Sequence, residues 1–194
     1  MQDYGASVLR IDKFSALFPD LLAAGKRSLA LNLKLEEGRV LASRLIAQAD
    51  VLLDPYRPGT LEAMGMSPSA LHAHNERLVI ARLTGYGVGA GHPHTSAAGH
   101  DINFLAMSGL LSLMHAPGGR PQPPLNLMAD FAGGSAMATV GTRACANSCV
   151  RSREATARGA VRARATNRAC VNSSCGAHAR VRVHVRTLAC VQGL

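Results

Sequence analysis

The chain has 194 residues, of which 47% are hydrophobic, enough for one domain with a hydrophobic core. Its net charge of +9 arises entirely in residues 139–194, which contain ten arginines, no lysine and one acidic residue, whereas residues 1–138 contain eleven basic and eleven acidic side chains. No stretch reaches the roughly 18 consecutive apolar residues of a membrane-spanning helix, and the first residues have no apolar core, so we expect neither a membrane span nor a secretory leader.

The first part of the chain predicts strands that alternate with helices. Residues 6–12 and 25–34 favour strands, and in the second the leucines recur at every other position, the period of a half-buried strand. Residues 36–50 place apolar side chains at helical spacing. Residues 51–54 form a short apolar run that is typical of a buried strand.

A turn and a second helix–strand pair come next. The two prolines and the glycine of PYRPGT, residues 55–60, predict a turn. Ser67 is a typical N-cap, and Pro68 suits the first position of the helix that follows. Residues 78–87 predict a strand that runs into a glycine-rich loop. Strands joined by helices indicate a mostly parallel sheet, so we predict an α/β fold, a partial Rossmann-like parallel sheet with flanking helices, for residues 1–138.

Two further helices are predicted after this strand, and each follows a loop. Residues 101–114 predict the first helix, with Asp101 as its N-cap. The loop HAPGGRPQPP separates it from the second, which begins within residues 125–138.

Residues 139–194 have a different composition, with all five cysteines and no Phe, Tyr or Trp. Because the segment has no stable apolar period, we predict a disordered basic tail. Its bias is typical of GC-rich codons read in a second frame, or of a retained intron. A basic arm that binds nucleic acid stays open as an alternative, but the lack of lysine and of aromatic residues disfavours it. A zinc site is disfavoured because the cysteines lack an ordered set of histidine partners, so we expect no metal.

The stretches AGHDINFLAMSG (98–109) and PPLNLMADFAGG (123–134) resemble the α-methylacyl-CoA racemases of the class III CoA-transferase family. Four other stretches follow the order expected for this family: DYGASVLRIDK, GKRSLALNLK, ADVLLDPYRPG and NERLVIARLTGYG. The resemblance covers residues 1 to about 138. It implies a fragment of the family's large domain that lacks the first strand–helix unit and the second domain, including a further glutamate of the catalytic region.

The resemblance implies a reaction that exchanges the configuration at the carbon beside a thioester. One group removes the α-proton on one face and a second group returns a proton on the other. The resemblance carries His100 and Asp130 into these two roles. A neutral imidazole accepts a proton near neutral pH, burial can raise the pKa of a carboxyl group, and backbone N–H groups at helix starts would stabilise the enolate. Gly99 is expected to give its turn freedom of φ, and Gly133 and Gly134 to allow close approach of a helix or of the substrate.

The resemblance also implies which positions contact coenzyme A. Lysine and arginine at strand ends and loops suit phosphate groups through charge and forked donors. The expected contacts are Lys13, Leu31, Asn32, Leu33, Lys34, Tyr56 and Arg57, with Gly99, Asp101, Ile102, Asn103 and Phe104 along the thioester end. Coenzyme A is part of the acyl-CoA substrate, so no separate cofactor is expected.

Two other functions stay open. A CoA transferase of the same family would use Asp130 as a nucleophile that forms a mixed anhydride. Transferases of the family usually carry an aromatic residue where this chain has His100, and the histidine therefore favours the racemase. The third hypothesis is a non-catalytic isoform that binds a full-length partner.

The resemblance further implies a homodimer in which both subunits build each site. Because the resemblance implies that this chain lacks the second domain, part of its own site should be missing, and we expect low or no activity from residues 1–194 alone. We expect neither nucleic acid nor a membrane as a partner. Relatives work in mitochondria and peroxisomes, but no targeting signal is readable in this sequence.

Overall fold

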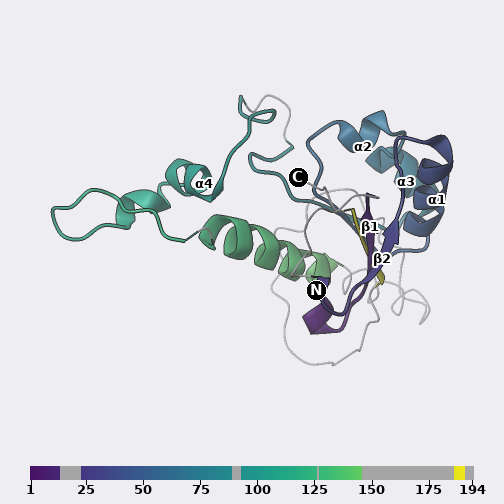
Figure 1. Cartoon of the computed structure of the whole chain (residues 1–194), viewed down its shortest axis with the longest axis horizontal. Helices are drawn as coiled ribbons and strands as arrows, with labels where there is room; N and C mark the ends of the chain where they lie inside the picture. The colour runs from purple at the N-terminus through teal and green to yellow at the C-terminus, as the bar shows by residue number, and fades with distance from the viewer. Residues whose placement is uncertain (14–22, 89–92, 126, 146–185, 191–194) are drawn as a thin grey trace, which may run out of the picture.

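The computed structural model describes residues 1–13, 23–88, 93–125 and 127–145, together with the backbone of residues 186–190 (Figure 1). Its centre is a five-stranded sheet in the order β2-β1-β5-β3-β4, in which every neighbouring pair runs parallel. The strands are β1 (Ser7–Asp12), β2 (Arg27–Ala30), β3 (Val51–Asp54), β4 (Val79–Arg82) and β5 (Arg186–Cys190). The mixed α/β fold with a parallel sheet, predicted from the sequence, is confirmed.

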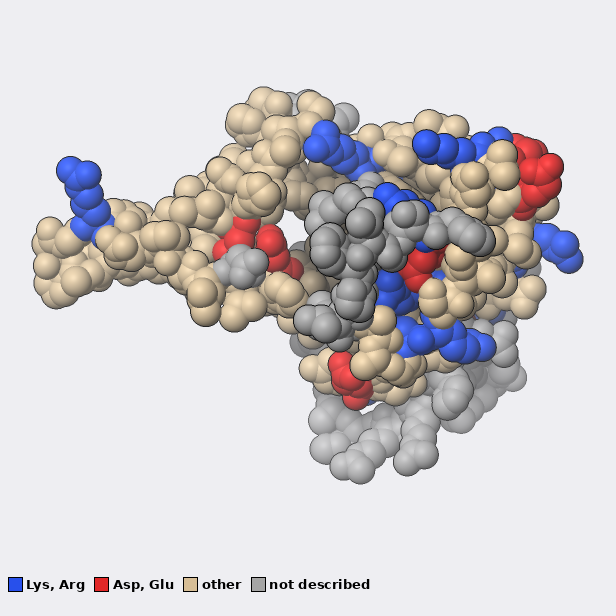
Figure 2. All heavy atoms as spheres, in the orientation of Figure 1, with Lys and Arg blue, Asp and Glu red and all other residues tan. Residues whose placement is uncertain are grey.

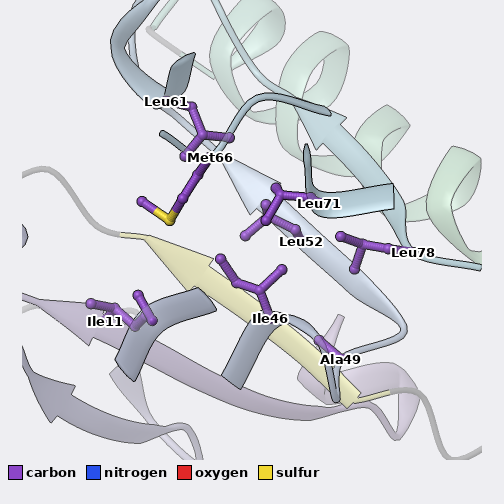
Figure 3. Close-up of a cluster of buried hydrophobic side chains, with 9 residues drawn as sticks. Ile11, Ile46, Ala49, Leu52, Leu61, Met66, Leu71 and Leu78 are labelled. Atoms are coloured by element: carbon purple, nitrogen blue, oxygen red, sulfur yellow. The ribbon is translucent and has the colours of Figure 1, made fainter. Parts of the chain in front are cut away.

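Three helices gather beside the sheet: α1 (Glu36–Ile46), α2 (Thr60–Ala63) and α3 (Pro68–His74) (Figure 1). Their apolar side chains meet those of the strands in one core (Figure 3). The buried members of this core are Ile11, Ala42, Ile46, Ala49, Leu52, Leu61, Met66, Leu71 and Leu78. Burying one large aliphatic side chain contributes about 1.5–3 kcal/mol, so this core is the main source of stability for the sheet and these helices.

Most elements of residues 1–88 form where the sequence predicts them. Strand β3 occupies the predicted residues 51–54, and Val51 and Leu52 are fully buried, as a continuous apolar run requires. The N-cap of α3 is also confirmed, because the Ser67 hydroxyl accepts a hydrogen bond of 3.2 Å from the backbone N–H of Ala70. Helix α2 was not predicted, because four residues are too short to show a helical period.

The segment after β4 forms a helical arm, the name used here for residues 101–145, which leads away from the sheet through α4 and returns towards the N-terminus in its last helix (Figure 1). It contains α4 (Asp101–Met107), a short 3-10 helix η3 (Leu110–Leu113) and a wide π-helix η4 (Met128–Ala136) that continues as an α-helix to residue 145. The single helix predicted for residues 101–114 is therefore wrong in extent. Gly109 has a φ of 80° and ends the first helix, since a left-handed residue cannot continue it.

The segment after residue 138 departs in two places from the predicted disordered tail. Residues 139–145 continue the last helix of the arm, and residues 186–190 form β5 at the centre of the sheet. The other residues of the predicted tail lie outside the described part of the chain. Among the described residues, no helix combines the length and apolar character needed to cross a membrane.

Candidate active site

A cavity of about 710 Å³ lies at the carboxyl ends of β1, β2 and β3. Ligands of open α/β sheets usually bind at this edge, and the volume is in the range of small-molecule sites. The side chains that line it come from three separate parts of the chain: Ile11, Asp12, Lys13, Leu31, Asn32, Leu33, Lys34, Arg39, Tyr56, Thr60 and Met64. Six of the seven positions expected to contact the body of coenzyme A are thus brought together, and only Arg57, which is exposed, is outside the lining.

The loop after β2 is fixed by hydrogen bonds within the wall of the cavity. The Asn32 side-chain oxygen accepts a hydrogen bond of 3.0 Å from the backbone N–H of Lys34. The guanidinium of Arg39 donates a hydrogen bond of 3.0 Å to the carbonyl oxygen of Lys34. A Cβ on Gly38 would lie 2.2 Å from the carbonyl oxygen of Asn32, so only glycine allows α1 to start so close to the loop. Sequence reasoning missed Arg39 and Gly38, because it followed only the apolar positions of this helix.

An ion-pair network holds the backbone of Tyr56, which lines the cavity. The buried carboxylate of Asp54 accepts a hydrogen bond of 3.0 Å from the backbone N–H of Tyr56. Arg82 lies 3.3 Å from Asp54 and 2.5 Å from Glu62 of α2. Burial raises the pKa of Asp54, against the opposing effects of the Tyr56 N–H and of Arg82. The hydrogen bond from Arg82 lowers the pKa of Glu62.

The two candidate catalytic residues lie at the starts of two helices of the arm. His100 is the N-cap of α4, and its backbone N–H donates a hydrogen bond of 2.9 Å to the side-chain oxygen of Asn103. Asp130 lies in the first turn of η4. Among the described residues, both His100 and Asp130 are exposed. Asp130 therefore lacks the burial that was expected for its carboxyl group.

Asp101 joins these two helix starts. Its side chain is only 4% exposed, and one carboxylate oxygen accepts hydrogen bonds from the backbone N–H groups of Ala129, at 2.7 Å, and of Asp130, at 2.8 Å. The prediction that Asp101 caps its own helix is therefore wrong. The N–H groups at the start of η4 have no partner within that helix, and Asp101 supplies the acceptor that they need.

The glycines beside this site allow close packing. Gly99 is outside the residues with positive φ, so the expected conformational freedom is not what it provides. A Cβ on Gly99 would instead lie 2.7 Å from the Tyr86 hydroxyl and 2.8 Å from the ring of Phe104. A Cβ on Gly85 would lie 2.6 Å from the same phenyl ring, which also packs edge-on against Tyr86 at 5.1 Å. Phe104 therefore anchors α4 to the loop after β4.

Of the two glycines of η4 that were expected to allow a close approach, only Gly134 packs against a side chain. A Cβ on Gly134 would lie 3.2 Å from the side chain of Leu83, whereas Gly133 meets only a carbonyl oxygen at 3.4 Å. Leu83 directly follows β4, whose last residue, Arg82, belongs to the ion-pair network. Residues 82–85 thus contact both the ion-pair network at Asp54 and the arm. The cavity lining itself contains neither His100 nor Asp130.

The expected thioester-end positions have separate environments on α4. Ile102 and Asn103 are exposed, Phe104 is half-buried, and Asp101 is buried. Within the described ranges, no cluster of three or more His, Cys, Asp or Glu side chains is arranged to hold a metal ion.

Comparison with known proteins gives this site a context. The chain is 45% identical to "Alpha-methylacyl-CoA racemase" of Mus musculus over 141 residues, which are 73% of this chain and 36% of the relative. It is 40% identical to "Probable fatty acyl-CoA transferase" of Mycobacterium tuberculosis over 114 residues, 59% of this chain and 28% of the relative. The chain thus spans about a third of the length of these relatives.

The fold and the sequence pattern agree with these relatives. A crystal structure of a CAIB/BAIF family protein from Brucella suis superimposes with a TM-score of 0.62 at 27% identity, over 79% of this chain and 44% of that one. The sequence pattern described as "CoA-transferase family III" matches residues 3–173. The chain therefore belongs to the CoA-transferase family III.

Proposed function

We propose that the chain serves the interconversion of (2R)- and (2S)-2-methylacyl-CoA thioesters by exchange of the α-proton. His100 removes the proton from one face of the α-carbon, which leaves an enolate of the thioester. Protonated Asp130 returns a proton to the opposite face, and the two roles reverse for the other enantiomer. After this turnover His100 carries an added proton and Asp130 is ionised, and proton exchange with water restores the starting state without any transfer of electrons. The proposal therefore needs no metal or redox cofactor, and coenzyme A takes part only as a portion of the substrate.

The contact that carries the proposal is the bridge made by Asp101. It directly follows His100 in the chain, and its buried carboxylate is hydrogen-bonded to the backbone N–H of Asp130. Asp130, which is far away in the sequence, is thus held by a hydrogen bond to the neighbour of His100. An imidazole and a carboxyl group held at two adjoining helix starts match the requirement for two proton-transferring groups around one carbon.

The enolate oxygen needs hydrogen-bond donors. The candidate donors are the backbone N–H groups at the starts of α4 and η4. The N–H groups of Ala129 and Asp130 already donate to Asp101, so the start of η4 is occupied. The first turn of α4, at Asp101 and Ile102, is the remaining helix start beside His100. We assign the oxyanion contact to this turn, because it also carries the positive end of the helix dipole.

The cavity beside β1, β2 and β3 supports an acyl-CoA as the substrate. It joins two lysines, Lys13 and Lys34, which suit the phosphates, with the ring of Tyr56 and apolar side chains of the strand ends. Residues 82–85 contact both the ion-pair network beside Tyr56 and the arm that directly follows His100. The thioester end of a bound acyl-CoA would extend from the cavity towards α4.

A CoA transferase remains the second candidate, because transferases also occur among the relatives. In that reaction the Asp130 carboxylate attacks the thioester carbonyl and coenzyme A leaves as a thiolate. His100 favours the racemase, since an imidazole beside the reacting carbon serves proton transfer and has no part in the attack itself.

The arm supports a homodimer as the assembly in which the site works. Several of its large apolar side chains are more than half exposed: Met107, Leu113, Leu125, Leu127, Met137 and Val140. Charged side chains are sparse on the face of the arm shown in Figure 2. Large apolar surfaces of this kind are typical of interaction sites, and a second copy of the chain would cover this one.

A deuterium wash-in experiment tests the proposal. A 2-methylacyl-CoA is incubated with the chain in D2O, and mass spectrometry follows label at the α-carbon. We expect slow labelling, because the chain spans only about a third of the length of its relatives, and loss of the labelling in His100→Ala and in Asp130→Ala. Acyl exchange between two CoA esters without α-label would support the transferase instead. Imaging of the tagged protein tests our further expectation of a mitochondrial or peroxisomal location.

A further inference from the structure

The sheet consists of two halves joined only through β5 within the described strands. Strands β1 and β2 form one half, and β3 and β4 form the other. Between them lies β5, with Ser7–Ile11 of β1 on one side and Val51–Leu53 of β3 on the other. Leu188 is a register partner of both Leu9 and Leu52. The backbone of five residues therefore holds the two halves in one sheet.

The strand at this position comes from an unusual part of the chain. From β1 the chain continues outward to β2 at one edge of the sheet, and from β3 it continues outward to β4 at the other edge. The two directions diverge at the centre, where β5 lies. In a doubly wound sheet of the order 2-1-3-4-5, the strands in the places of β1 and β3 are direct neighbours. Here residues 186–190 lie between β1 and β3, and they come from beyond the family match that ends at residue 173.

We call the place between the facing edges of β1 and β3, where β5 lies, the central slot. A strand edge at the centre of a sheet exposes N–H and C=O groups that need partners, and an extended backbone supplies them. The neighbouring side chains Val8, Ile11, Val51 and Leu52 are buried, which makes the surroundings apolar. Recognition by strand addition depends on backbone pairing first, so segments from different origins can fill such a slot.

We propose that the slot between β1 and β3 is a binding site for an extended peptide segment in parallel orientation, and that residues 186–190 of the same chain are its tethered occupant. The length of the connection is no obstacle, because the entropy of closing a loop grows only slowly with its length. Because residues 186–190 belong to the same chain as β1 and β3, their effective concentration at the slot is higher than that of a free peptide. The proposal is independent of the catalytic function.

A proline substitution in the full chain tests this site. Leu188→Pro removes a backbone N–H at the centre of β5, whereas Arg186→Pro, the matched control, changes the first residue, where proline is tolerated. We expect Leu188→Pro to lower Tm by roughly 6–12 °C and to expose the amides of both β1 and β3 to hydrogen exchange, with little change in the control. Equal Tm and equal protection in the two variants would overturn the proposal.

Rescue in trans tests whether the segment acts as a ligand. A synthetic peptide with the sequence of residues 183–194 is added to the Leu188→Pro chain. We expect a saturable rise in Tm and restored protection in β1 and β3, and no effect from the same peptide carrying the proline. A lack of rescue in a folded variant would overturn the binding site.

A disulfide in the full chain keeps the test decisive if Leu188→Pro fails to fold. Ile11 and Cys190 are register partners, so the Ile11→Cys variant should form a disulfide with Cys190 inside one chain under mild oxidation. Leu29→Cys is the control, because Leu29 pairs with Ile11 on the opposite edge of β1. Peptide mapping of the Ile11→Cys variant that finds no disulfide between the substituted position and Cys190, or finds it only between two chains, would overturn the intramolecular occupant.

Discussion

Removal of the Asp101 carboxylate should loosen the start of η4 while leaving the sheet intact. Asp101→Ala deletes the acceptor of two hydrogen bonds, from the N–H groups of Ala129 and Asp130. Hydrogen bonds to a charged group contribute about 1.5–3 kcal/mol each, but water reaches this helix start, because Asp130 is exposed. Loss of a helix cap costs about 0.5–2 kcal/mol, so we expect a loss near the upper end, about 2 kcal/mol.

The assay combines global and local stability. Urea unfolding followed by circular dichroism gives the free energy of unfolding, and a loss of about 2 kcal/mol corresponds to a Tm lower by about 4–8 °C. Hydrogen exchange should show faster exchange at the amides of Ala129 and Asp130 in particular. Asp101→Asn keeps an acceptor oxygen and loses only the charge, so its loss should be about half as large.

A matched control separates this bridge from a general effect of charge. Asp3 is an exposed carboxylate in the first turn of η1 (Gln2–Tyr4), and Asp3→Ala should change the free energy of unfolding by less than about 0.5 kcal/mol. If Asp101→Ala matched this control in stability, and the amides of Ala129 and Asp130 exchanged at the parent rate, the bridge would have no energetic role.

Four further predictions concern the supports of the cavity and of the arm. The pKa of Asp54 is raised above its usual 3.8, so the stability of the parent relative to Asp54→Asn should increase as the pH falls through the raised pKa to below 3.8. The pKa of Glu62 is lowered from its usual 4.5, so the stability of the parent relative to Glu62→Gln should decrease as the pH falls below 4.5 through the lowered pKa. Gly99→Ala should cost about 1–3 kcal/mol in thermal or urea unfolding, because the added methyl displaces Phe104. Lys34→Ala should weaken coenzyme A binding about tenfold in calorimetry, because it removes a positive charge from the cavity wall.

Each of these predictions has a control and an outcome that contradicts it. The two pH profiles check each other, since parallel slopes for the Asp54 and Glu62 pairs would contradict the assigned directions. Gly133→Ala meets no close side chain and should be tolerated, so an equal loss for both glycine variants would rule out crowding at Phe104. Arg77→Ala removes an exposed charge outside the cavity, and the same loss of coenzyme A affinity there would reduce the effect of Lys34 to net charge.

The local elements could be predicted from the sequence because local rules determine them. The apolar run of β3 and the Ser–Pro start of α3 have signals within a few residues, and both form as predicted. The resemblance to relatives also selected the residues around the cavity, such as Lys13 and Tyr56, which the fold brings together from separate strand ends.

The contacts that hold the site in place could not be predicted in this way. Asp101 has the sequence position of an N-cap, but its acceptor is used by a helix start far along the chain, and only the tertiary fold reveals this. Gly99 has the appearance of a turn residue, whereas its role depends on how closely Phe104 approaches. The place of β5 between β1 and β3 depends on pairing with strands far away in the sequence, and composition alone carries no signal for it.

The arrangement of the two proton-transferring groups can be tested most directly by a crystal structure of the chain with a bound 2-methylacyl-CoA. We predict that the coenzyme A portion occupies the cavity at Lys13, Lys34 and Tyr56, and that the α-carbon lies between the His100 imidazole and the Asp130 carboxyl group, within hydrogen-bond reach of both. A bound thioester whose α-carbon lies against only one of these two side chains, or away from the arm altogether, would contradict the two-base reaction.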